Sequence, residues 1–172
     1  KEGYVENSIS RQIVVNYIKS FGIKRLVEFG CGLGKTSDFI HSNTDIDILG
    51  VDISETSIQK SKLNYPHLNF KVDEIINIGN YKDYDCYFFS EITWYLLEDK
   101  MIDRIFDIMK KKLKGKYFIH NLVFYKGQQK YGNEYFTSLK EFISFCPFKL
   151  VGKVEIDICG NDCFETSSIF KI

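Results

Sequence analysis

Short apolar runs alternate with helix-like segments along most of this 172-residue chain. The runs are RLVEF, DILGVD, NFKVD, DCYFFS and KYFIHNLVFY, at residues 25–29, 47–52, 69–73, 85–90 and 116–125. Apolar runs of this length, separated by helices, are typical of parallel strands that crossover helices bury on both faces. The alternation therefore predicts an α/β fold built on a mostly parallel sheet.

Three segments have the apolar spacing of amphipathic helices. One begins behind Asn7 or Ser8 as N-cap and ends at Gly22, and another starts after Thr137 and ends at Pro147. The clearest lies between the fourth and fifth runs, where one face carries Ile102, Ile105, Phe106, Met109 and Leu113. We expect these segments to be helices that cover the sheet.

The chain closes with two alternating runs, residues 149–158 and 163–172, joined by Cys159-Gly160-Asn161-Asp162. Alternating runs with a short turn between them predict an antiparallel hairpin. Nothing resembling a linker or repeat divides the sequence. The expected fold is a Rossmann-like, doubly wound, seven-stranded sheet, mostly parallel with an antiparallel C-terminal hairpin strand, in a single domain spanning 1–172.

Lysine plus arginine and aspartate plus glutamate both total 23, so the formal net charge is zero. No overall field attracts DNA, RNA or an anionic membrane, and no apolar stretch reaches the length that spans a bilayer. Five cysteines without CxxC spacing argue against a disulfide framework or a zinc site. We expect a cytoplasmic protein whose partner is a small molecule, with no DNA, membrane or metal bound.

The segment VEFGCGLGKT, residues 27–36, combines features of two nucleotide-binding loops. A P-loop, GxxxxGK[ST], would need glycine where Phe29 stands. The dinucleotide pattern GxGxxG would need glycine or alanine where Lys35 stands. Neither phosphate-binding pattern is in register.

The same stretch, E-F-G-C-G-L-G, resembles the first motif of class I S-adenosylmethionine-dependent methyltransferases, with Glu28 two residues before the first of three alternate glycines. Asp52-Ile53-Ser54 is similar to the second motif, and Val72-Asp73-Glu74 to the third-strand motif. The resemblance covers roughly residues 8–125. Residues Glu91–Leu97 also resemble the E-x-x-x-Y-L pattern of small nodulation-type and natural-product methyltransferases.

The resemblance implies S-adenosylmethionine as cofactor, with S-adenosylhomocysteine as product. Glu28 would hold the α-amino group, Asp52 the ribose hydroxyls, and Ile53 would lie against adenine, whose polar edge would meet Asp73 or the next backbone amide. Glycines permit close approach of the backbone to a ligand and positive φ in the turn. The cofactor-binding residues implied are Glu28, Gly30, Gly32, Gly34, Asp52, Ile53, Asp73, Glu74 and Ser90.

The implied activity is methyl transfer to oxygen or nitrogen of a small polar metabolite, such as a sugar, a nucleotide-linked precursor or an amine. The slot after the fourth strand reads SEIT and lacks the prolines of nucleic-acid base methylases. An oxygen acceptor usually needs a base; His120, which would face the cleft if the fifth strand ends near it, and Glu91 are the two candidates. A binding subunit without catalysis, or a protein or RNA acceptor, remain alternatives.

Aromatic residues are concentrated after the fourth strand and in the segment 122–136. A loop of this composition above the cleft fits a lid or an acceptor site, although the same aromatics could simply pack against helices. Tyr4 could close over the donor from the other side. The candidate acceptor residues are Trp94, Tyr95, Asn121, Tyr125, Tyr131 and Tyr135.

Overall fold

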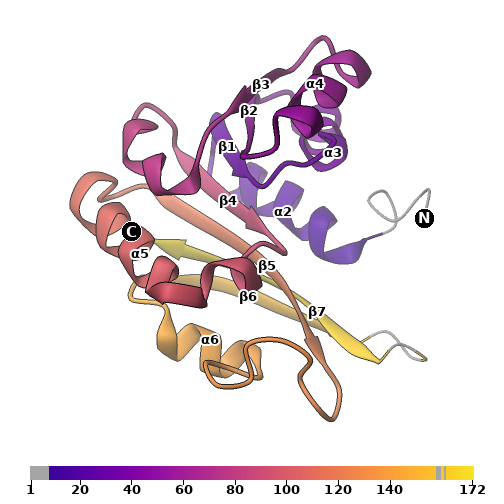
Figure 1. Cartoon of the computed structure of the whole chain (residues 1–172). Coiled ribbons are helices and arrows are strands. Elements are labelled where there is room, and N and C mark those ends of the chain that lie inside the picture. The colour runs from indigo at the N-terminus through magenta and orange to yellow at the C-terminus, as the bar shows by residue number, and fades with distance from the viewer. Residues whose placement is uncertain (1–7, 158–159, 161) are drawn as a thin grey trace.

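The computed structural model describes residues 8–157, 160 and 162–172. Its centre is one seven-stranded sheet in the order β3-β2-β1-β4-β5-β7-β6 (Figure 1). The strands are β1 (Arg25–Phe29), β2 (Asp47–Asp52), β3 (Asn69–Val72), β4 (Cys86–Ser90), β5 (Tyr117–Tyr125), β6 (Lys149–Asp157) and β7 (Cys163–Lys171). All seven coincide with the runs expected from the sequence.

The first five strands pair in parallel, and β7 runs antiparallel to both of its neighbours, β5 and β6. The C-terminal hairpin thus inserts its second strand next to β5 and leaves β6 at the sheet edge. This confirms the predicted fold class. The expected turn residues Cys159 and Asn161 lie outside the described residues.

Helices cover both faces of the sheet (Figure 1). One face carries α2 (Ile9–Ser20), α3 (Lys35–Thr44) and α4 (Glu55–Asn64). The other carries the 3₁₀ helix η1 (Ile75–Asn80), α5 (Met101–Lys112) and α6 (Leu139–Phe145). Two short 3₁₀ helices, η2 (Thr93–Leu96) and η3 (Glu98–Lys100), fill the connection from β4 to α5. The three helices expected from apolar spacing are α2, α5 and α6.

Local sequence signals account for several helix ends. Ser54 caps α4 by accepting the Ser57 N–H, and Ser138 caps α6 by accepting the Glu141 N–H. Such side chains satisfy backbone N–H groups that have no partner inside the helix. The helices α4 and α6 therefore begin directly after Ser54 and Ser138.

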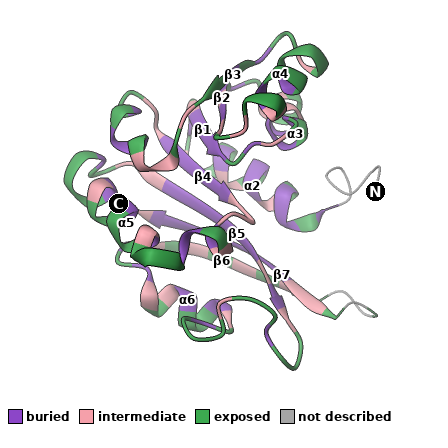
Figure 2. Ribbon diagram, in the orientation of Figure 1, coloured by how far each residue is buried: buried purple, intermediate pink, exposed green. Residues whose placement is uncertain are grey.

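The core consists of an apolar layer on each face of the sheet, and the central strands are buried along most of their length (Figure 2). The α5–α6 side is rich in aromatic rings, among them Phe89, Phe118 and Phe142, each 0% exposed. The α2–α3 side is formed mostly by isoleucine, leucine and valine. The two layers enclose the central strands of the sheet between them.

His120 does not meet the condition under which it would face the cleft, namely a strand that ends near it. The strand does not end near His120 but continues to Tyr125, because β7 supplies backbone partners along its whole length. His120 is therefore an interior strand residue with 0% exposure, and it does not face a cleft.

Phe142→Ala tests the contribution of the aromatic layer. The ring is fully buried and stacks on His120 with centroids 3.8 Å apart. We expect a loss of about 3–5 kcal/mol in the free energy of unfolding, measured by urea denaturation. Leu63→Ala, at a leucine that is 81% exposed in α4, is the control and should change the value by less than about 0.5 kcal/mol.

Candidate active site

The glycine turn joins β1 to α3 at the carboxyl edge of the sheet. The N–H groups of Gly30 and Cys31 both donate to the Val51 carbonyl, which ties the turn to the end of β2. Gly30 has φ +75°, and a Cβ there would stand 2.3 Å from Ile92. A side chain at this position would collide with the segment that follows β4, so glycine is required.

Gly32 has a different environment. Its φ is +53°, and among the described residues no heavy atom outside its chain neighbours lies within 4 Å of a Cβ built there. The backbone is therefore approachable at Gly32. Gly34, the N-cap of α3, instead packs on the Phe70 ring.

Asp52 connects the end of β2 to the glycine turn. One carboxylate oxygen accepts the Gly32 N–H at 2.9 Å, and the other accepts the Ser54 N–H at 2.9 Å. The carboxylate and the turn are consequently held side by side at the mouth of the same cavity. Hydrogen bonds to a charged acceptor are stronger than those between neutral groups.

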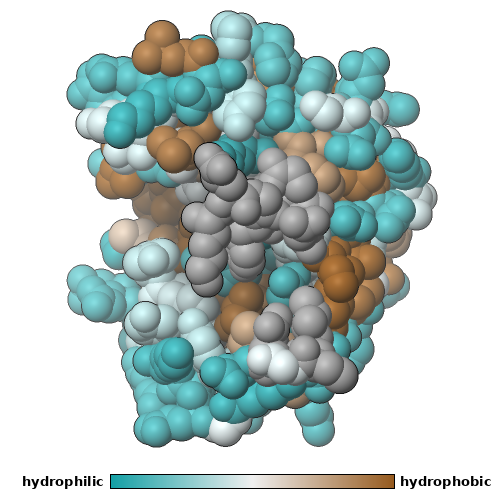
Figure 3. Space-filling model, turned by 90° about the vertical axis from the view of Figure 1, so that its right-hand side faces the viewer, coloured by the Kyte–Doolittle hydropathy of each residue, from teal (hydrophilic) through white to brown (hydrophobic). Residues whose placement is uncertain are grey.

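A cavity of about 490 Å³ opens at this edge of the sheet. Its polar wall is Asp52, Asp73 and Glu74; its apolar lining is Phe29, Val51, Ile53, Ile75, Ile76, Ile92, Tyr95, Leu96 and Met101, together with Gly30. On the side seen in Figure 3, hydrophobic side chains gather around a recess between hydrophilic surfaces. A mostly apolar cavity with few, clustered polar groups is the usual form of a small-molecule site.

Asp73, at the end of β3, is held by donors from its own surroundings. Its carboxylate accepts hydrogen bonds from the Lys71 ammonium, the Tyr81 hydroxyl, the Asn77 amide and the Glu74 N–H. Burial by itself would raise the pKa of Asp73, but these donors outweigh it and hold that pKa below its usual range. The carboxylate therefore stays ionised at one end of the cavity wall.

Glu28 lies behind the glycine turn and does not line the cavity. It is 2% exposed and accepts a hydrogen bond from the Ser37 hydroxyl in α3. Burial raises the pKa of Glu28 to about 7, partly opposed by the Ser37 hydrogen bond and the positive charge of Arg11. Arg11 in turn donates through Nε to Thr36 at 3.1 Å, which connects α2 to the start of α3.

No protein-family model matches the sequence, but individual relatives do. The chain is 30% identical over 126 residues to malonyl-[acyl-carrier protein] O-methyltransferase 1 of Ilyobacter polytropus, covering 69% of this chain and 42% of that one. It is 31% identical over 93 residues to protein 235L of Invertebrate iridescent virus 6, a methyltransferase by name. This match covers 53% of this chain and 35% of the viral protein. The chain thus spans less than half the length of either relative.

Among solved structures, the N-methyltransferase NodS from Bradyrhizobium japonicum superposes with a TM-score of 0.72 at 14% identity, covering 99% of this chain and 97% of NodS. The structure of NodS in complex with S-adenosylhomocysteine superposes with a TM-score of 0.73, covering 97% of this chain and 87% of NodS. The structural superpositions show a shared fold, and the related sequences indicate the family. The chain belongs to the class I S-adenosylmethionine-dependent methyltransferases.

In this methyltransferase fold, four predicted cofactor residues line the cavity along with Gly30: Asp52, Ile53, Asp73 and Glu74. Ile53 is 72% exposed at its rim. Gly32 adjoins Asp52, whereas Gly34 and Glu28 lie behind the turn, and Ser90 ends β4 half-buried. The structure therefore brings together the predicted strand ends; the contacts each residue makes with a ligand stay predictions.

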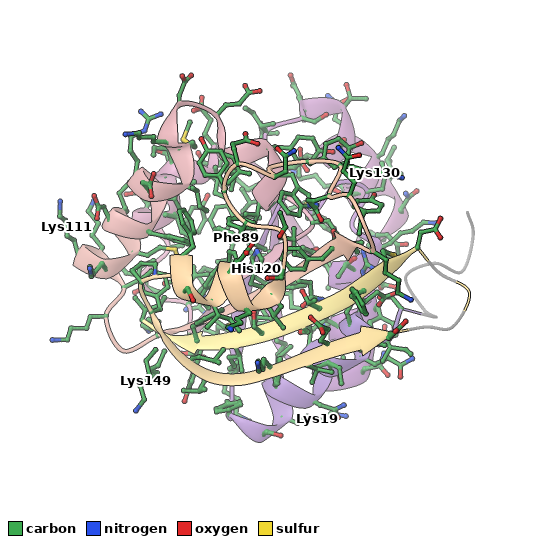
Figure 4. The ribbon with its side chains drawn as sticks, turned by 90° about the horizontal axis from the view of Figure 1, so that it is seen from below. Lys19, Phe89, Lys111, His120, Lys130 and Lys149 are labelled. Carbon is green, nitrogen blue, oxygen red and sulfur yellow. The ribbon has the colours of Figure 1, made fainter. Side chains whose placement is uncertain are left out.

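The two candidate bases differ sharply. His120 is stacked on Phe142 and accepts or donates one hydrogen bond with the Thr93 hydroxyl at 2.7 Å, and burial lowers its pKa to about 3. Figure 4 shows His120 and Phe89 in the interior near α6, whereas the labelled lysines project outward. Glu91 directly follows β4 at the carboxyl edge, part-exposed.

The Glu91 backbone is in the left-handed region, with φ +60°. A non-glycine residue held there costs roughly 1–3 kcal/mol, and such strain clusters at functional sites. Its carboxylate accepts the Val123 N–H at 3.1 Å, and burial raises its pKa to about 7. Of the two candidates, Glu91 lies at the carboxyl edge and His120 in the core, and the role of Glu91 as a base stays a prediction.

The aromatic-rich segment 122–136 packs against the residues that follow β4. The Trp94 ring lies 5.4 Å from Phe136, and the Tyr135 hydroxyl donates to the Leu97 carbonyl at 2.9 Å. Tyr125 and Tyr131 meet edge to face, 6.5 Å apart. Tyr95, 82% exposed, lines the cavity mouth. Trp94 and Tyr135 thus have structural partners, and their role in acceptor binding stays a prediction; Tyr4 lies outside the described residues.

Two buried charged residues on the α2 side of the sheet, Arg11 and Glu165, were not predicted from the sequence. Arg11 is 9% exposed and Glu165, in β7, is 8% exposed. Glu165 accepts hydrogen bonds from the Ser8 hydroxyl and the Ser10 N–H. A usable signal existed for Arg11, because its spacing from Val14, Val15 and Ile18 places it on the buried stripe of α2.

The raised pKa of Glu28 predicts a pH-dependent stability. The neutral carboxyl is favoured in the fold, so its stabilising effect is fully present below the unfolded pKa of 4.5 and is lost as the pH rises to about 7. Glu28→Gln keeps an acceptor for Ser37 but cannot ionise. We expect the variant to gain stability over the wild type by on the order of 3 kcal/mol between pH 4.5 and 7, with no further gain above.

Urea unfolding at a series of pH values measures this difference, which cancels the contributions of His120 and other groups common to both proteins. Glu98→Gln, at an exposed residue of η3, is the control and should follow the wild type. A constant difference between Glu28→Gln and wild type across this pH range would show that Glu28 is ionised in the fold.

Proposed function

We propose that this chain binds S-adenosylmethionine and transfers its methyl group to a small polar acceptor. The observation that carries the proposal is the pairing of Asp52 with the Gly32 N–H at the wall of the cavity. It places a carboxylate suited to ribose hydroxyls beside a backbone that a ligand can approach closely.

The residues present fit this cofactor. The apolar wall that includes Ile75, Ile76 and Leu96 suits an adenine ring, and the open space at Gly32 suits the amino-acid end. The cofactor supplies an activated methyl group on a sulfonium, so the protein mainly aligns the acceptor and removes a proton where one must leave. Glu91 follows β4 at this edge and takes the second role.

Charge separates this proposal from phosphate-containing ligands. Asp52, Asp73 and Glu74 line the cavity, and Glu28 lies behind the turn. Carboxylates repel a pyrophosphate and attract a ligand with an ammonium and a sulfonium. An NAD-dependent activity is therefore disfavoured by the same residues that favour S-adenosylmethionine.

The acceptor belongs to the proposal as well. The related Ilyobacter protein is an O-methyltransferase by name and NodS an N-methyltransferase, so both oxygen and nitrogen acceptors occur among similar proteins. We propose residues 1–172 as a single cofactor-binding domain that acts on a small molecule. None of the helices in the described ranges combines the length and the apolar character that crossing a membrane requires.

Gly32→Val tests the approach of the ligand to the turn. The added side chain occupies the space beside Asp52, so calorimetry should show loss of S-adenosylhomocysteine binding by at least about 100-fold. Gly22→Val is the matched control, because Gly22 also has positive φ (+64°) and open surroundings among the described residues but lies at the end of α2, on the opposite edge. Equal losses in both variants would remove the turn from the binding site.

Asp52→Ala tests the ribose contact. We expect S-adenosylhomocysteine affinity to fall by about 1–3 kcal/mol, measured by the same titration. Asp47→Ala, at the other end of β2 and paired with Arg25, is the control. Unchanged affinity in Asp52→Ala would place the cofactor elsewhere.

A further inference from the structure

A row of polar side chains crosses three neighbouring strands at the level where β4 ends. Ser90 pairs in register with Asn121, and Asn121 with Ser167. Side chains two residues apart share a face, and Phe88, Ile119 and Ile169 all pack in the core on the α2 side. Ser90, Asn121 and Ser167 therefore point to the α2 face of the sheet.

Two members of this row are buried without partners. Asn121 is 1% exposed and Ser167 0% exposed. In the described part of the chain, nothing hydrogen-bonds to either end of the Asn121 amide or to the Ser167 hydroxyl. Buried polar groups are nearly always satisfied, so the row has unused donors and acceptors that a polar ligand can meet.

Two carboxylates adjoin the row. Glu91 bonds to the Val123 N–H, and Val123 pairs in register with Glu165 on β7, on the same face as Asn121 and Ser167. Arg11 from α2 acts electrostatically on both Glu91 and Glu28. Formally, the carboxylates of Glu91 and Glu165 next to the row carry two negative charges, and Arg11 carries one positive charge that also acts on Glu28.

This imbalance determines which ligands the site favours. A buried surplus of negative charge is relieved by a cation, whereas an anionic or neutral group leaves it uncompensated. Among the described residues, Arg11 is a cation that acts on Glu91, and it also acts on Glu28, so a bound ammonium adds to the compensation of the carboxylates next to Asn121. The next pair on this face after Val123 and Glu165, Tyr125 and Cys163, is part-exposed.

We propose that the acceptor of this methyltransferase is a primary or secondary amine, whose ammonium form is bound by Glu91 together with the Asn121 amide oxygen and Ser167. The inference rests on the proposed function and specifies its substrate class. Asn121 is a specificity residue, because its carbonyl accepts from N–H groups in a buried position where an alcohol offers a single donor.

The methyl transfer needs only these groups and the cofactor, and its atoms and charges balance. The bound ammonium loses one proton to the Glu91 carboxylate. The freed nitrogen lone pair forms the N–CH₃ bond while the C–S bond breaks, and that electron pair stays on sulfur. Glu91 then returns its proton to solvent.

The test uses the protein saturated with S-adenosylhomocysteine and three minimal probes. Methylammonium has charge and N–H donors, tetramethylammonium has charge alone, and methanol has a donor without charge. We expect only methylammonium to shift the NMR signals of the Asn121 side-chain amide and the Val123 N–H, with saturation as its concentration rises. Equal shifts with methanol, or none with methylammonium, overturn the proposal.

Two variants distinguish a binding role from a structural one. Glu91→Gln keeps an acceptor for the Val123 N–H but removes the charge, and should weaken methylammonium at least 10-fold; Glu98→Gln, on the exposed η3, should not. Asn121→Leu removes the unpaired amide and should raise Tm by roughly 2–10 °C while abolishing the methylammonium shift at Val123. A fall in Tm with the Val123 shift retained would make Asn121 structural.

Turnover is measured as S-adenosylhomocysteine release with matched pairs: putrescine and 1,4-butanediol, glucosamine and glucose, benzylamine and benzyl alcohol. At least one amine should react and its alcohol should not. If the protein does not bind S-adenosylhomocysteine at all, the proposed function fails. If it binds the cofactor product but the alcohols react as well as the amines, or no amine reacts, only the amine proposal fails.

Discussion

The site depends on the link between the ends of β1 and β2. Backbone N–H groups of the glycine turn donate to the Val51 carbonyl, and the Gly32 N–H donates to Asp52. A turn that must take positive φ at alternate positions would be mobile without such anchors. Because these bonds fix the turn, the cavity beside it has a defined wall, and the segment after β4 can close against Gly30.

Burial and hydrogen-bond donors shift the pKa values of the carboxyl groups around this turn in opposite directions. Asp73 is kept ionised by four hydrogen-bond donors, whereas burial raises the pKa of Glu28 and Glu91 to about 7. One fold therefore provides an ionised carboxylate at the end of β3 and two buried carboxyls with raised pKa, Glu28 in β1 and Glu91 after β4. This division suits a reaction in which a cationic donor is bound at one place and a proton leaves at another.

The polar residues of the cavity wall were predictable from the sequence, and the surroundings of the β5 side chains were not. Asp52, Asp73 and the glycines are marked by their positions directly after apolar runs, so local patterning locates them. His120 and Asn121 are neighbours in sequence, yet one stacks on Phe142 in α6 and the other faces α2. Only the length of β5, which β7 sets by pairing with it, decides that both are interior.

The sequence by itself determined the strands, their order of appearance, the glycine turn and the acids that follow β2 and β3, because each depends on contacts within a few residues. The tertiary structure alone decided that β7 lies between β5 and β6, that His120 is buried and neutral, and that Glu165 meets Ser8, 157 positions away. Pairing between distant segments leaves no local periodicity, so the polar row at Asn121 emerges only when the sheet is assembled.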